Sequence, residues 1–120
     1  GGRLYSAGEL DRLVKVWDAE RLDCLATHNF QWHSVRALAF GDGSLFAGTD
    51  GGHVGVYDPD SMKCMATLCR FSRVRSLAYG DGWLYVGDAN GCISVWDAQR
   101  AERGKLRGHS RSVEGLALDG

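Results

Sequence analysis

A short segment of alternating apolar residues, ending in an aromatic residue and an aspartate, occurs three times in this chain. The copies are Val14–Asp18, Val54–Asp58 and Ile93–Asp97, and their first residues are 40 and then 39 residues apart. A period of this length is typical of architectures whose repeating unit cannot bury its apolar faces alone and stacks against copies of itself. The repeat therefore predicts three similar units side by side.

Three further kinds of segment repeat in the same register, and all are short and rich in strand-forming residues. With the repeat already described, they give four sets of predicted strands in each unit. The first set is 34–40, 73–79 and 112–118, and the second is 4–8, 45–49 and 84–88. The third is the repeat at 14–18, 54–58 and 93–97, and the fourth is 24–27, 64–67 and 103–106. Gly-Asp-Gly runs at 41–43 and 80–82 predict tight hairpins, because Gly and Asp tolerate the positive φ that such turns need. Each unit is therefore predicted to be a four-stranded antiparallel meander.

Two segments are also compatible with a helical interpretation. Residues 18–26 and 97–106 each start with an aspartate that could cap a helix, and both have an amphipathic pattern. Strands that alternate with such helices would form a parallel sheet. The glycine-marked hairpins and the register of the repeat favour strands.

Composition and motifs limit the classes of function. The net charge is −1 with no run of like charge, so nothing predicts nucleic-acid binding. No stretch approaches the roughly 20 apolar residues of a membrane span, and no secretory segment is visible. The chain lacks the nucleophile-elbow, Walker lysine and zinc-protease motifs, so we expect no enzyme and no cofactor. We also expect no metal, because the spacing of His28 and His33 from Cys24 is not a recognised zinc arrangement.

The four cysteines are predicted to be free thiols. Cys24 and Cys64 occupy equivalent places in the repeat, where we expect them to behave as small buried apolar residues. No Cys-x-x-Cys pair occurs, and disulfide formation requires a compartment and a geometry that the sequence does not suggest. We therefore expect a cytoplasmic or nuclear protein that is not secreted.

At its Trp-Asp and Gly-His pairs, the chain resembles the WD-repeat β-propeller family over essentially its whole length. Trp17-Asp18 and Trp96-Asp97 match the closing dipeptide of the family, and Tyr57-Asp58 is a variant of it. Gly108-His109 matches the opening dipeptide, which the other two units lack. The resemblance implies an all-β fold of propeller blades, three blade equivalents per chain, and a non-enzymatic protein–protein interaction scaffold.

The resemblance also implies a hydrogen-bonded set of four side chains that holds a blade together. One complete set is present: His109, Ser6, Asp11 and Trp17. A hydroxyl and a carboxylate at these places would satisfy the buried indole and imidazole nitrogens, so its role is expected to be structural. The other units are expected to lack the set, with Gln31, Ala47, Gly51 and Tyr57 in one and Arg70, Val86, Asn90 and Trp96 in the other.

Because this set joins the two ends of the chain, one blade is expected to be split. Residues 1–29 would supply its second to fourth strands, 30–69 and 70–108 would be full blades, and 109–120 would be a first strand completing the split blade of a neighbouring copy. Three blades cannot close a ring, since propellers typically need about four to eight. We therefore expect a head-to-tail homo-oligomer, with a dimer of six blades favoured over a trimer of nine. The alternative is a fragment of a longer propeller.

In the family, the loops between fourth and first strands lie on one rim of the ring, and here they are aromatic and basic. Residues of these types anchor protein interfaces. The candidate residues for binding other proteins are Phe30, Trp32, Arg70, Phe71, Arg73 and Arg111. Phe30 and Phe71 could instead be blade-packing residues. A ring that binds a small ligand or glycan is a further alternative, but it would need the same side chains in each unit, and the rim residues differ.

Overall fold

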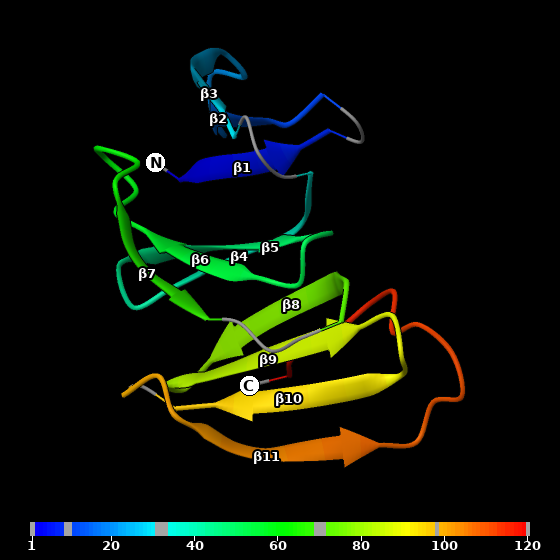
Figure 1. Ribbon diagram of the computed structural model, residues 1–120. Helices are drawn as coiled ribbons and strands as arrows, with labels where there is room; N and C mark the ends of the chain where they lie inside the picture. The colour runs from blue at the N-terminus through cyan, green and yellow to red at the C-terminus, as the bar shows by residue number, and fades with distance from the viewer. Residues whose placement is uncertain (1, 9–10, 31–33, 69–71, 98, 120) are drawn as a thin grey trace.

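Three antiparallel sheets make up the protein, stacked face to face (Figure 1). The structure is a computed structural model and describes residues 2–8, 11–30, 34–68, 72–97 and 99–119. Within these ranges the chain contains eleven strands and no helix, so the helical interpretation of 18–26 and 97–106 is excluded. The all-β prediction is confirmed.

Each sheet is a meander in which strands consecutive in the chain are hydrogen-bonded neighbours. The first sheet contains β1 (Arg3–Ala7), β2 (Leu13–Asp18) and β3 (Cys24–Asn29). The second contains β4 (Val35–Gly41), β5 (Ser44–Thr49), β6 (Val54–Tyr57) and β7 (Cys64–Leu68). The third contains β8 (Val74–Gly80), β9 (Trp83–Asp88), β10 (Cys92–Trp96) and β11 (Glu102–Arg107). The first sheet therefore has one strand fewer than the others.

The hairpin that opens each complete sheet follows from its turn residues. Gly41 pairs with Ser44, so the turn between β4 and β5 consists of two residues, Asp42 and Gly43, with φ of 54° and 73°. Asp81 and Gly82 repeat this conformation between β8 and β9, with φ of 52° and 83°. Two consecutive positive φ values match the right-handed twist of the strands, which explains the Asp-Gly pair at both places.

The aspartate that ends the repeated segments 14–18 and 54–58 organises the turn that follows. Asp18 Oδ1 accepts hydrogen bonds of 2.9 Å from the backbone N–H groups of both Glu20 and Arg21, and Asp58 does the same in its own turn. These hydrogen bonds, the one from Arg21 first, lower the pKa of Asp18, because they stabilise the charged carboxylate. The Asp of the repeated dipeptide is therefore a turn residue.

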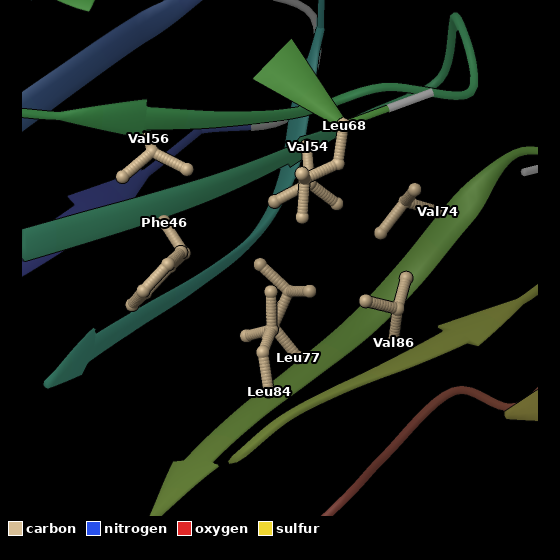
Figure 2. Close-up of a cluster of buried hydrophobic side chains, with 8 residues drawn as sticks. All are labelled: Phe46, Val54, Val56, Leu68, Val74, Leu77, Leu84 and Val86. Carbon is tan, nitrogen blue, oxygen red and sulfur yellow. The ribbon is translucent and has the colours of Figure 1, made fainter. Parts of the chain in front are cut away.

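Apolar side chains fill the two junctions between the sheets. Val14 of the first sheet packs against Val35, Leu45 and Ala47 of the second. Figure 2 shows the cluster at the second junction, which β5, β6 and β7 form with β8 and β9. Its members are Phe46, Val54, Val56, Leu68, Val74, Leu77, Leu84 and Val86. Most of the fully buried valines lie in these two layers, so neighbouring sheets provide the core.

The C-terminal segment lies on the third sheet as β8 lies on the second. A Cβ on Gly48 would overlap Val74, and 39 residues later a Cβ on Gly87 would lie within 3 Å of Val113. Val113 also donates its N–H to the Asp88 carbonyl at 2.9 Å and accepts a 2.8 Å hydrogen bond from the Ser76 hydroxyl. Residues 112–118 therefore occupy the place of a first strand for a further sheet, although they belong to none of the sheets in the described part of the chain.

The expected burial of two cysteines is wrong. Cys24 and Cys64 are free and exposed, because they begin β3 and β7, the outermost strands of their sheets. Cys92 is free and buried, and Cys69 lies outside the described residues.

Candidate interaction surface

One face of the first sheet is uncovered where the matching faces of the other sheets are buried. Leu4, Leu45 and Leu84 are the second residues of the equivalent strands β1, β5 and β9. Leu45 and Leu84 are 0% and 3% exposed because the preceding sheet packs on them, whereas Leu4 is 60% exposed. The repeat thus gives Leu4 the residue type of a junction and no sheet to pack against within the described chain.

A second residue on the first sheet has the same property. Leu22 and Met62 close equivalent turns with positive φ, 64° and 57°. Met62 is partly buried against the cluster at the first junction, while Leu22 is 77% exposed. Leu4 and Leu22 define what we call the leading face, the side of the first sheet that points away from the second.

Exposure on the first sheet does not by itself identify the leading face. Leu25 of β3 is 53% exposed, but its repeat equivalent Met65 of β7 is 59% exposed even though its sheet has neighbours on both sides. Leu25 is therefore an outer-strand residue, and its exposure does not result from a missing sheet. It offers a matched comparison for Leu4.

The outer side of the third sheet is uncovered in the complementary way. Val14, Val16, Val54 and Val56 are all buried, because the following sheet covers them. Their equivalents Ile93 and Val95 are only half-buried. These two residues, with the segment 112–118 beside them, define the trailing face. The stack therefore ends in two apolar surfaces that match the two sides of an ordinary junction.

The structure brings together two of the four residues predicted to form the blade-holding set. Trp17 Nε1 donates a 2.9 Å hydrogen bond to Ser6 Oγ between β2 and β1. Asp11 Oδ1 accepts a 2.9 Å hydrogen bond from the N–H of Leu13 in the same loop. His109 lies with the third sheet, where its carbonyl faces Gly91. Within one chain His109 is thus separated from Ser6 and Trp17, and the complete set stays a prediction.

Three of the predicted rim residues have described positions. Arg73 and Arg111 are exposed at the entries to β8 and to the segment 112–118. Phe30 is half-buried, with its ring centroid 4.9 Å from that of Tyr57, so it takes part in the first junction. The other three, Trp32, Arg70 and Phe71, lie outside the described residues.

The sequence analysis did not identify a charged group that involves the first strands of the second and third sheets. Arg36 and Arg75, each directly after a repeated valine, lie 3.8 and 4.0 Å from the same oxygen of Asp50. Both distances exceed a hydrogen bond, so each ion pair contributes little to stability. With Glu114 the two arginines line a cavity of about 260 Å³. The 39-residue spacing of these three residues was the signal that could have identified them.

Among the described residues, no group of three or more His, Cys, Asp or Glu side chains could hold a metal ion. Nor does this part of the chain contain a helix of the length and hydropathy required to span a membrane.

Comparison with solved structures identifies the fold. The chain is similar to the WD40 repeats of RRP9, with 20% identity, a TM-score of 0.82 and coverage of 94% of this chain and 37% of that one. It is equally similar in shape to a chain of the mitotic checkpoint complex, with 23% identity, a TM-score of 0.82 and coverage of 98% and 37%. For Sqt1 of Saccharomyces cerevisiae the values are 16%, 0.79, 94% and 32%.

These similarities show a WD40-type β-propeller fold, as the Trp-Asp repeat predicts. No family model matches the chain, and no curated protein matches it in sequence. The chain spans little more than a third of the first solved structures it matches.

Proposed function

We propose that this protein is a non-enzymatic protein–protein interaction scaffold whose three blades are completed by a second copy of the chain, joined head to tail. The observation that carries the proposal is the exposure of Leu4, at a position that is buried in both other sheets. A second copy is the proposed occupant because the trailing face repeats the residue types that cover Leu45 and Leu84. The leading face of one copy then meets the trailing face of the other.

The register of the proposed contact follows from the repeat. Phe40 pairs with Leu45 and Tyr79 pairs with Leu84 in the two complete sheets. The same offset pairs Leu118 of one copy with Leu4 of the other, so the segment 112–118 becomes the missing first strand of the first sheet. Strand β1 would then lose its unpaired edge, which is otherwise a liability for aggregation.

The size of the contact is adequate for a closed dimer. A face of four strands with about five residues each covers roughly 300 Å², so two junctions with two faces each bury about 1,200 Å². Specific interfaces start at about this size. When two copies associate into a closed pair, two junctions form at once. The pair contains six blades, within the usual range of about four to eight. The rim residues Arg73 and Arg111 are left free for other proteins, the general role that the WD40 neighbours support.

Light scattering after gel filtration tests the proposal with matched variants. The unmodified chain is expected to elute at twice its 13.1 kDa mass. Leu4→Asp is expected to convert it to a folded monomer, because it places a charge in the junction. Leu25→Asp, the control on the outer strand β3, is expected to remain a dimer. A folded, unmodified chain that stays at 13.1 kDa at all concentrations would contradict self-completion, and the free faces would then belong to a longer propeller.

A further inference from the structure

Two arginines lie side by side where the first strands of the second and third sheets begin. Arg36 and Arg75 lie 3.8 and 4.0 Å from the same oxygen of Asp50, and their side chains are only 26% and 19% exposed. The strand register skips the arginine in both sheets, and such a bulge re-aims the side chain. Side chains at this repeat position therefore come close to each other across the junction between neighbouring sheets.

The third residue at this repeat position has the opposite charge. Glu114 comes 39 residues after Arg75, which itself comes 39 residues after Arg36. The Glu114 side chain is exposed, and its carboxylate accepts a hydrogen bond from the Ser112 hydroxyl. All three charged residues line the same cavity of about 260 Å³. We call Arg36, Arg75 and Glu114 the inner residues.

The register of the proposed contact between copies determines which inner residue Glu114 meets. Glu114 precedes Leu118 by four residues, as Arg36 precedes Phe40. The contact pairs Leu118 of one copy with Leu4 of the other, so Glu114 enters the first sheet at the place that Arg36 takes in the second. The first and second sheets are neighbours (Figure 1). The inner residues on the two sides of that junction are therefore Glu114 of one copy and Arg36 of the other.

We propose that Glu114 of each copy forms an ion pair with Arg36 of the other copy, and that this pair makes the head-to-tail contact specific. Within one chain the same relation brings Arg36 and Arg75 to one oxygen of Asp50, so it brings Glu114 within reach of Arg36 between copies. Opposite charges at a contact speed the encounter and fix its register, whereas like charges there oppose association. The inference rests on the proposed function, because only a second copy places Glu114 in the sheet next to Arg36.

Two charge-reversed chains test the pair, with sedimentation equilibrium measuring the dissociation constant of the dimer. Glu114→Arg and Arg36→Glu each place like charges at both contacts between identical copies, so each is expected to weaken self-association at least about tenfold. An equal mixture of the two variants has opposite charges at both contacts. We expect the mixture to form a hetero-dimer about as tight as the unmodified dimer.

Matched controls separate the pair from a change in net charge. Lys63→Glu and Glu20→Arg make the same charge changes on exposed turns. They are expected to leave self-association unchanged and to gain nothing from being mixed. Circular dichroism of each variant reports whether it is folded.

A chain that carries both Glu114→Arg and Arg36→Glu keeps the test decisive if one single variant folds poorly. It is expected to recover self-association, because both contacts again join opposite charges. If the unmodified chain is a dimer, three results overturn the ion pair and leave self-completion standing: single variants that self-associate as tightly as the unmodified chain, a mixture no tighter than its components, or a double variant that does not recover. A folded but monomeric unmodified chain overturns self-completion and the ion pair with it.

Discussion

Replacing Leu45 by alanine tests how much stability one junction provides. Leu45 is 0% exposed and packs with Val14, Val35 and Ala47 between the first two sheets. Truncation of a fully buried leucine removes its transfer free energy and leaves a cavity, which together cost about 2–5 kcal/mol. A domain of this size has a free energy of unfolding of about 5–15 kcal/mol, so the variant should remain folded but weakened.

Urea unfolding followed by circular dichroism measures this loss. With a slope of about 2 kcal/mol per molar urea, a loss of about 2–5 kcal/mol is expected to lower the midpoint by roughly 1–2.5 M. Leu4→Ala removes the same atoms at the equivalent position. In dilute protein, where the monomer dominates, it should cost less than about 1 kcal/mol, because Leu4 is 60% exposed. Equal losses for the two variants in dilute protein would refute the assignment of Leu45 to a junction and Leu4 to a free face.

Three further predictions concern packing, hydrogen bonding and pH. Gly48→Ala should destabilise the protein by about 1–3 kcal/mol, because the added methyl overlaps Val74 of the next sheet. Gly104→Ala should be tolerated, because no atom lies within 4 Å of the added methyl. Thermal melts that shift equally for the two variants would contradict this. Ser6→Ala should cost about 0.5–1.5 kcal/mol and shift Trp17 fluorescence, since the indole loses its acceptor; an unchanged spectrum would count against the bond. The folded-state pKa of Asp18 is lowered, so its contribution to stability is present above the ordinary value of 3.8 and is lost as the pH falls through the lowered value. Asp18→Asn should therefore flatten the acid limb of a melting temperature–pH curve, and an identical limb would contradict the assignment.

Strands and turns could be predicted from the sequence because their causes are local. The Asp-Gly pairs at 42–43 and 81–82 specify two-residue turns by backbone preference alone, and both occur as expected. The alternation around Val54 and Val56 marks a strand whatever packs on it. The repeat then carried these assignments from one unit to the next.

Burial could not be predicted in the same way, because it depends on which sheet lies alongside. Leu4 and Leu45 are the same residue at the same repeat position, yet one is exposed and the other is not. Cys24 was expected to be buried, but it lies on an outermost strand whose position in the sheet only the topology determines.

Disulfide cross-linking between two differently labelled copies tests head-to-tail completion most directly. In a background without the native cysteines, one preparation carries Leu4→Cys and the other carries Leu118→Cys. The register taken from Phe40 and Leu45 places these two residues opposite each other across the contact, within reach of a disulfide. We predict that the mixed preparation forms the hetero-dimer on mild oxidation and that neither preparation alone forms a dimer as readily. Cross-links confined to Leu4→Cys with itself, or no preference for the mixed pair, would contradict the proposed assembly.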